Sequence, residues 1–234
     1  MIVTTRRTLI RGAAFALVAL SQLPGVARAQ SDGWFDIAGD DGKPMANTRL
    51  PVELTSEIEA LPGVIWIGAS SRAVTLYEFY DYNCPYCRVA ATDLHTLVSA
   101  RPELRVGLVN NAILSPGSVQ AARVEAALLS LKGPQPAYEL HRRLFARPGR
   151  RDGLQALALA EELGASRGEV EALADSDGIG KMVSAQRDLA ANLGLAATPS
   201  FVAGGAGLLG YPGPKTLDRI VSALDECGEA ICTS

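Results

Sequence analysis

The hydrophobic pattern of this chain divides it into two kinds of segment. Short runs rich in β-branched and aromatic residues are typical of buried strands, and they flank a long stretch in which apolar residues recur at helical spacing. Strands are expected at residues 64–67, 74–80, 104–109, 200–203 and 207–210. Helices are expected at residues 54–61, 85–100, 118–131, 136–145, 154–163 and 179–193, with a short helix from 166 and a closing helix at 214–227. This order predicts an α/β fold with a helical insertion at about residues 117–194.

Single residues indicate where several of these helices begin. Pro136 suits the first turn of its helix, because the N–H that a proline lacks would have no partner there. Asp152 can cap the helix that follows it. Ser166 and Glu169 have the spacing of a capping box, in which each side chain bonds to the backbone N–H of the other residue.

Polar, turn-rich sequence precedes the first predicted strand, and its composition indicates a loose leader. The expected organisation is an export segment at 1–29, a leader with a short helix at 30–62, a domain at 63–226 and a C-terminal tail at 227–234.

The first 29 residues are typical of an export signal. Arg6 and Arg7 precede an apolar run at residues 13–20, and Ala27-Arg28-Ala29 fits a small-x-small cleavage site. The apolar run is too short to cross a bilayer, which takes about 20 residues. The paired arginines favour a twin-arginine (Tat) signal over an ordinary Sec signal. We therefore expect export to the periplasm, cleavage near Ala29 and no stable membrane insertion.

The charge balance narrows the class of partners. The chain has 22 basic and 25 acidic residues, and cleavage of the export segment would remove four arginines and no acid. An acidic chain without a basic tract is unsuited to bind nucleic acid or an anionic membrane surface. Its 234 residues are enough to bury a substantial core.

The candidate chemistry lies in Cys84-Pro85-Tyr86-Cys87, between a predicted strand and a predicted helix. Two cysteines at this spacing can cycle between dithiol and disulfide, and this context is typical of redox motifs. The helix N-terminus favours a thiolate at Cys84, and Pro85 suits the first helical position. We therefore predict Cys84 as the nucleophile and Cys87, one turn deeper, as the resolving thiol, with no metal or cofactor. The alternatives are a structural disulfide or half of a zinc site.

A second pair of cysteines, Cys227 and Cys232, follows the closing helix. Four cysteines in an exported chain suit an oxidising compartment. We predict a structural disulfide that holds the C-terminal tail. The alternative is a second redox pair that relays electrons to the first, which only the even number of cysteines supports.

The segment from Glu78 to Cys87, Glu-Phe-Tyr-Asp-Tyr-Asn-Cys-Pro-Tyr-Cys, resembles the active-site segment of the DsbA-like thioredoxin-fold thiol–disulfide oxidoreductases of bacterial envelopes. The resemblance covers most of residues 64–226, and it implies a thioredoxin-like central sheet with an inserted helical domain. Residues 110–116, Asn-Asn-Ala-Ile-Leu-Ser-Pro, depart in their first positions from the Phe-Pro-Ile-Leu-Gly-Pro-like loop of the family.

The resemblance also implies two features of the site. The Thr198-Pro199 bond should be cis, with Pro199 beside the sulfurs and its backbone pairing with an extended substrate. Glu78 falls where the family places a buried acid beneath the active site, and its apolar neighbours favour burial over an edge position that faces water. A buried carboxylate beside Cys87 can pass a proton during exchange, with a pKa raised by desolvation.

Tyr86, between the two cysteines, bears on the direction of electron flow. Strong oxidases of the family often carry histidine there, whose positive charge helps to stabilise the thiolate. Tyrosine cannot supply that charge, which leaves a milder oxidant or an isomerase open. The two histidines of the chain, His95 and His141, lie on predicted helices and are expected to be surface or half-buried structural residues.

Together these features predict an exported thiol–disulfide oxidoreductase that introduces disulfides into exported proteins. Its partners would be cysteine-containing exported proteins and a membrane or periplasmic redox partner. A disulfide isomerase or reductase of the same fold is the alternative within the enzyme class. A non-catalytic module that binds a metal or a protein partner is the alternative of another class.

Overall fold

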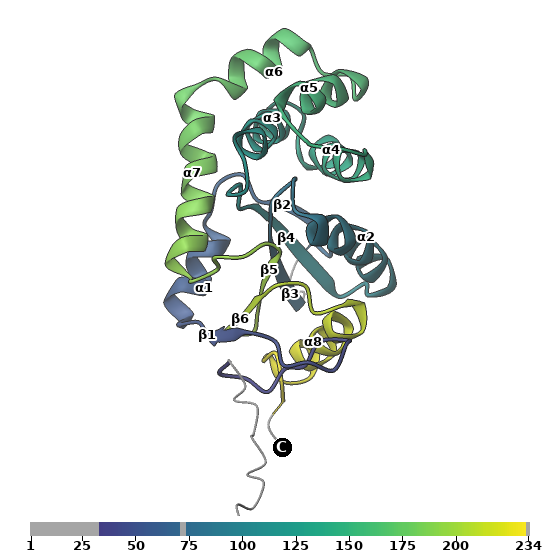
Figure 1. The fold of residues 1–234 in the computed structure, drawn as a ribbon, viewed down its shortest axis with the longest axis vertical. Helices are drawn as coiled ribbons and strands as arrows, with labels where there is room; N and C mark the ends of the chain where they lie inside the picture. The colour runs from purple at the N-terminus through teal and green to yellow at the C-terminus, as the bar shows by residue number, and fades with distance from the viewer. Residues whose placement is uncertain (1–32, 71–73, 233–234) are drawn as a thin grey trace, which may run out of the picture. The chain divides into compact units, whose positions relative to one another are not determined.

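A six-stranded sheet forms the centre of the chain in the computed structural model, which describes residues 33–70 and 74–232 (Figure 1). The export segment expected at 1–29 lies outside the described residues. The strands are β1 (Asn47–Arg49), β2 (Ile65–Gly68), β3 (Val74–Tyr80), β4 (Leu104–Asn110), β5 (Ser200–Ala203) and β6 (Ala206–Leu209). Their order is β1-β6-β5-β3-β4-β2, and only the pair β3–β4 is parallel.

Eight helices surround this sheet in the described part of the chain. They are α1 (Val52–Glu59), α2 (Pro85–Ala100), α3 (Pro116–Lys132), α4 (Pro134–Ala146), α5 (Gly153–Glu162), α6 (Arg167–Ala174), α7 (Asp177–Asn192) and α8 (Pro214–Cys227). Helix α2 is the crossover between the parallel strands β3 and β4. Helices α3 to α7 are inserted between β4 and β5, and Figure 1 shows α3 to α6 grouped beyond one end of the sheet.

The central strand β3 is buried on both faces, because its side chains alternate between two hydrophobic clusters. Leu76 and Tyr80 pack with residues of α2, α4 and α8. Tyr77 and Phe79 pack on the opposite face, with residues of α1 and α7. The β-branched and aromatic run that predicts a buried strand therefore lies at the middle of the core.

The hairpin between β5 and β6 is a two-residue turn at Gly204 and Gly205. Their φ angles are 49° and 76°, which glycine adopts without the steric penalty of a side chain. A turn with positive φ at both positions matches the twist of the two strands. The local sequence therefore dictates the hairpin that was predicted there.

The helix starts agree with the sequence signals in part. Asp152 caps α5 as predicted, accepting a hydrogen bond from the N–H of Gln155 at 3.1 Å. Helix α4 begins earlier than predicted, at Pro134, so that Pro136 is its third residue. The predicted capping box at α6 is wrong, because the Ser166 side chain accepts no capping hydrogen bond.

The polar stretch before the first predicted strand is part of the fold from Ile37 to Leu50, both of which are 5% exposed. Strand β1 pairs with β6 at the edge of the sheet. The expectation of a loose leader is therefore wrong for this stretch. Its polar composition does not predict the backbone pairing with β6 or the burial of Ile37 and Leu50.

Asp40, in the same stretch, caps a helix that lies far away in the sequence. Its carboxylate accepts hydrogen bonds from the N–H groups of Lys215 at 3.0 Å and Thr216 at 2.8 Å. Helix α8 follows Gly213, which has no side chain to cap it. A carboxylate at a helix N-terminus satisfies unpaired N–H groups and complements the helix dipole.

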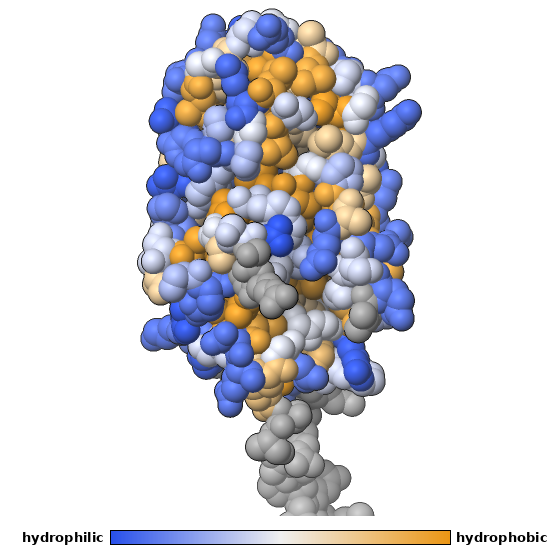
Figure 2. Space-filling model, turned by 180° about the vertical axis from the view of Figure 1, so that it is seen from behind, coloured by the Kyte–Doolittle hydropathy of each residue, from blue (hydrophilic) through white to orange (hydrophobic). Residues whose placement is uncertain are grey.

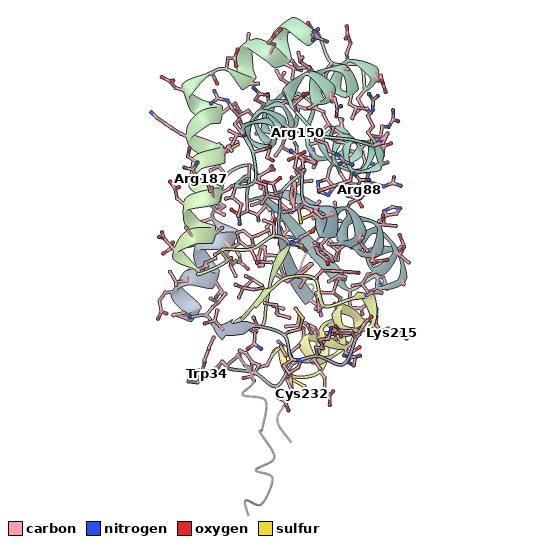
Figure 3. All side chains as sticks on the ribbon, viewed as in Figure 1. Trp34, Arg88, Arg150, Arg187, Lys215 and Cys232 are labelled. Carbon is pink, nitrogen blue, oxygen red and sulfur yellow. A yellow bond between two sulfur atoms is a disulfide. The ribbon has the colours of Figure 1, made fainter. Side chains whose placement is uncertain are left out.

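The disulfide predicted between Cys227 and Cys232 is present at the end of α8. Figure 3 labels Cys232 at the end of the described chain opposite the helical insertion. Seen from behind in Figure 2, hydrophilic residues line much of the outline, and apolar residues gather between them toward the end formed by the insertion. Within residues 33–70 and 74–232, no helix combines the length and the apolar character needed to cross a membrane.

We predict that Asp40→Ala lowers the free energy of unfolding by about 1 kcal/mol, because α8 loses its cap. Asp41→Ala is the matched control. Asp41 is exposed and pairs with Lys43, so its removal should change stability by less than about 0.5 kcal/mol. Urea unfolding of the two variants checks the difference, and equal midpoints would contradict the capping role.

Candidate active site

The two cysteines of the Cys-Pro-Tyr-Cys motif lie at the N-terminus of α2, as predicted. Cys84 is the N-cap residue, and its sulfur accepts a hydrogen bond from the N–H of Cys87 at 3.4 Å. Pro85 is the first helical residue. Cys84 is 5% exposed and Cys87 is fully buried, and both are free thiols. The helix therefore presents one sulfur at its tip and hides the other.

The environments of the two sulfurs push their pKa values in opposite directions. The contact with Cys87 lowers the pKa of Cys84 to about 6 against the effect of burial, with further contributions from Thr198 and from the N–H groups of the first helical turn. Burial raises the pKa of Cys87 far above its usual range. Near neutral pH, Cys84 is thus the thiolate and Cys87 the thiol.

The Thr198-Pro199 bond lies against the nucleophile and is cis, as the resemblance implies. As a thiol, Cys84 donates to the carbonyl of Thr198 at 3.0 Å. The Thr198 hydroxyl is buried and has no hydrogen-bond partner among the described residues. It is therefore free to donate to the thiolate when Cys84 ionises.

Glu78 is fully buried in β3, the strand that leads to the motif. Neither of its carboxylate oxygens has a hydrogen-bond partner within the described chain. Burial raises the pKa of Glu78 to about 8, and the charge of Cys84 adds to this effect. The prediction of a buried acid is confirmed by this position, and an acid with this pKa can hold or release a proton near neutral pH.

Asp81 organises the loop in front of the motif, although no role for it is predicted from the sequence. Its buried carboxylate accepts hydrogen bonds from the N–H groups of Asn83 at 2.7 Å, Ile113 at 2.9 Å and Leu114 at 2.8 Å. The Ser118 hydroxyl donates a fourth at 2.6 Å. One carboxylate thus joins the loop before Cys84 to the loop after β4 and to the start of α3.

Asn83 extends this connection to the loop between α4 and α5. Its amide donates to the Ser118 hydroxyl and to the Arg151 carbonyl, each at 2.9 Å, and its oxygen accepts from the N–H of Arg151 at 2.9 Å. The Arg151 guanidinium is buried and donates to backbone carbonyls at the end of α4, among them Leu144 and Phe145 at 3.2 Å. The residue beside the nucleophile is therefore fixed by the helical insertion.

A second buried carboxylate, Glu125 of α3, lies behind the site. The hydroxyls of Tyr80 and Tyr82 donate to it, as does the Asn110 amide at 2.5 Å. His141 of α4 lies 3.5 Å from it, measured from Nδ1 to Oε1. His141 is 1% exposed, so the expectation of a surface or half-buried histidine is wrong here. The cluster links the insertion to the end of β3.

The insertion begins and ends close to the site. The N–H of Asn111 donates to the Tyr80 carbonyl at 2.7 Å, and its side-chain amide donates to the Leu195 carbonyl at 3.2 Å. The N–H of Asn110 donates to the side chain of Gln186 in α7 at 2.8 Å. Both ends of the insertion are therefore held at the edge of the active site.

The surface around the motif includes Tyr86, which is 64% exposed beside the nearly buried Cys84. His95, farther along α2, is half-buried as expected, and its Nδ1 lies 3.0 Å from the hydroxyl of Tyr138. Within the described chain, no three side chains of His, Cys, Asp or Glu are grouped so that they could hold a metal ion.

Only one local sequence pattern indicates any of the site residues that were not predicted. Asp81 and Asn83 stand two positions apart just before a helix, and an Asp side chain at that spacing commonly accepts from the backbone N–H two residues on. That signal predicts the turn but not its partners. Ser118, Glu125 and Arg151 lie far along the chain and have no local pattern that connects them to the motif.

We predict that Asp81→Asn lowers the free energy of unfolding by about 3 kcal/mol, because the amide cannot accept all four hydrogen bonds and turns a donor toward other donors. Asp188→Asn, a substitution of an exposed residue on α7, is the matched control and should change stability by less than about 0.5 kcal/mol. Thermal or urea unfolding measures both, and a loss below about 1 kcal/mol at Asp81 would contradict its role.

Comparison with known proteins gives the same fold. A family model described as thioredoxin matches residues 60–226. A thioredoxin-like oxidoreductase from Silicibacter pomeroyi DSS-3 is 29% identical, with a TM-score of 0.66 over 74% of this chain and 96% of its own. The thiol-disulfide exchange protein alpha-DsbA2 from Wolbachia pipientis is 20% identical, with a TM-score of 0.65 over 74% and 94%. The catalytic domain of Proteus mirabilis ScsC is 24% identical, with a TM-score of 0.64 over 72% and 94%. No curated protein sequence matches this chain.

These similarities confirm the predicted thioredoxin-like sheet with a helical insertion, and they confirm the resemblance to DsbA-like structures. The matched segment runs from the end of α1 through the two cysteines to α8. It includes the cis proline and the buried acid as well as the insertion. The chain belongs to the thioredoxin family.

Proposed function

We propose that the protein is an exported thiol–disulfide oxidoreductase that introduces disulfides into exported proteins, with Cys84 as nucleophile and Cys87 as resolving thiol. The observation that carries this proposal is the asymmetry of the two sulfurs. The pKa of Cys84 is lowered to about 6, whereas burial raises that of Cys87. Such a pair provides one thiolate at the tip of the helix and one fully shielded partner, which suits thiol–disulfide exchange.

In the oxidising direction, the protein begins with a disulfide between Cys84 and Cys87. A substrate thiolate attacks the Cys84 sulfur, forms a mixed disulfide and expels Cys87, which takes up a proton. A second substrate thiolate attacks the substrate sulfur of the mixed disulfide and releases Cys84 as a thiolate. The substrate loses two electrons and gains a disulfide, and a membrane or periplasmic protein with a disulfide of its own would reoxidise the pair.

The lowered pKa of Cys84 supports the oxidising direction. A stabilised thiolate favours the reduced form of the protein and makes its disulfide a stronger oxidant. Tyr86 carries no positive charge, so that the contact with Cys87, and after it Thr198 and the N–H groups at the helix N-terminus, would supply the stabilisation. A measured reduction potential of about −120 mV would indicate a strong oxidant, and one of about −270 mV would favour the reductase alternative.

Glu78 would supply the proton that Cys87 requires as it is expelled. It is buried in β3, has no hydrogen-bond partner in the described chain, and has a pKa of about 8 in the reduced protein. A buried acid that titrates near neutral pH can give a proton during one half of the cycle and take it back during the other.

The backbone at Thr198-Pro199 would hold the substrate. A cis proline beside the nucleophile has no N–H of its own, and its neighbour Thr198 lies within contact of the Cys84 sulfur. An extended substrate could pair with this backbone while its cysteine reaches Cys84. The export signal predicted at 1–29 would bring the protein to the periplasm, where such substrates fold. The name of the Wolbachia relative, a thiol-disulfide exchange protein, supports the same chemistry.

We predict that Cys84→Ser abolishes oxidative refolding of a reduced model protein. When Cys87→Ser is given a protein that already contains a disulfide, it should accumulate a mixed disulfide, because Cys84 attacks that disulfide, expels one of its sulfurs as a thiolate, and no resolving thiol is present to release the other. The double variant Cys227→Ser, Cys232→Ser is the control, and it should retain the wild-type rate if that disulfide is structural. Gel analysis after alkylation detects the mixed disulfide. A Cys84→Ser protein that still forms disulfides would refute the mechanism, and loss of activity in the control would favour a redox relay.

We predict that Glu78→Gln slows formation of the mixed disulfide by about tenfold or more, because the amide cannot give Cys87 its proton as that sulfur is expelled. The folded pKa of about 8 lies above the ordinary value of 4.5, so the protonated acid favours the fold. Wild-type stability therefore falls as the pH rises from 4.5 through 8, by up to a few kcal/mol.

The Glu78→Gln protein should lack this pH dependence. Unfolding of the reduced proteins at about pH 5, near the lower end of that range, and at about pH 9, beyond its upper end, measures the effect. Glu53→Gln, at an exposed position of α1, is the control and should follow the wild type. Parallel stability curves for wild type and Glu78→Gln would show that the carboxyl titrates normally, against the proposed role.

A further inference from the structure

We propose that a cationic groove between α2 and α4 binds an acidic segment of the polypeptide whose cysteine reacts with Cys84. The inference rests on the proposed function and adds a substrate class to it: cysteine-containing polypeptides with a carboxylate close to the reacting cysteine. The groove lies beside the motif, and none of its residues takes part in the chemistry of the sulfurs.

The groove has a volume of about 260 Å³, and Arg88, His95 and Arg142 line it. Its apolar wall includes Ala91 and Phe145, and the described residues that line it include no acid. Pockets for whole small molecules usually have volumes of about 300–1,000 Å³. The size therefore suits one or two side chains of a bound polypeptide, and the charge suits a carboxylate.

The positive charge of Arg88 does not stabilise the helix that carries it. It lies in the first turn of α2, where the helix dipole disfavours a positive charge. No carboxylate lies within ion-pair distance of it among the residues that the structure describes. Figure 3 labels Arg88 between α2 and α4. An unpaired arginine at this position is available to an anion from outside.

Two further polar residues of the groove, Arg142 and His95, are held in place by neighbouring side chains. Arg142 lies 3.3 Å from Glu139, but Arg143 also binds that carboxylate, at 2.7 Å. One carboxylate therefore serves two arginines. The Nδ1 of His95 lies 3.0 Å from the hydroxyl of Tyr138, which restricts the orientation of the ring. An incoming carboxylate would meet one free arginine and one that shares its partner.

The distance from the nucleophile limits where the acid would lie in the substrate. The N–H of Arg88 donates to the carbonyl of Cys84 at 3.4 Å, so the two residues are one helical turn apart, a rise of about 5–6 Å. An extended chain advances about 3.3 Å per residue. Because the arginine side chain reaches outward from the helix, we expect the carboxylate about two to four residues from the reacting cysteine.

The whole chain is acidic, with a formal net charge of −3, so its overall field would not attract an anionic partner. Any preference for an acidic substrate must therefore come from a local site such as this groove. Local charge complementarity acts mainly on the association rate and on the choice of partner, and it weakens as salt increases.

The test compares two reduced dithiol peptides that differ only in Glu or Gln three residues from the first cysteine. The oxidised wild-type protein should oxidise the Glu peptide about tenfold faster at low salt, and the ratio should fall toward one at high salt. The double variant Arg88→Gln, Arg142→Gln should lose the preference. Arg187→Gln, an exposed position on α7 labelled in Figure 3, is the matched control and should retain it.

The ratio of the two rates cancels any change in intrinsic reactivity caused by substitution near Cys87. A wild-type ratio of one, an unchanged ratio in the double variant, or an equal loss in Arg187→Gln would each overturn the groove as the binding site. Oxidation of the Gln peptide reports separately on the proposed function. If that peptide is oxidised without any preference for Glu, only the groove fails, whereas if neither peptide is oxidised, the oxidase proposal fails with it.

Discussion

The arrangement of the active site depends on the burial of one charged group, the carboxylate of Asp81. A buried carboxylate is stable only when hydrogen-bond donors surround it, and Asp81 has four. Those donors come from two segments that are distant in sequence, Asn83 and residues 113–118, so the charge is satisfied only when both are in place. The loop that carries Cys84 is thereby held in one position by an electrostatic requirement, and the start of α2 follows from it.

The chemistry then arises from where α2 begins. A sulfur at the N-cap accepts a hydrogen bond from the backbone and lies at the positive end of the helix dipole, whereas a sulfur one turn later faces the core. Glu78 is buried in the adjacent strand, with no hydrogen-bond partner among the described residues, and burial raises its pKa so that it remains protonated to unusually high pH. Cys84, Cys87 and Glu78 thus differ in proton affinity because of their positions in the fold.

The sequence was sufficient where a structure depends on neighbours in the chain. The bounds of β3, the two-glycine hairpin and the cap at Asp152 could each be predicted from a local pattern. It was insufficient where partners are distant. Asp40 caps α8 across 175 positions, and Tyr80 meets Glu125 across 45. The cis bond before Pro199 was predicted only through resemblance, because nothing local distinguishes it from an ordinary trans turn.

The amide of Asn111 that bonds to Leu195 spans 84 positions of sequence with a single contact of 3.2 Å. The chain therefore leaves the sheet and returns to it at nearly the same point. Because the entropy of closing a loop grows only with the logarithm of its length, the sheet is little affected by how many residues lie between the two ends. The number of residues in the insertion could therefore change with little effect on the strands, provided that Ser118 and Arg151 still reach the loop that carries Cys84.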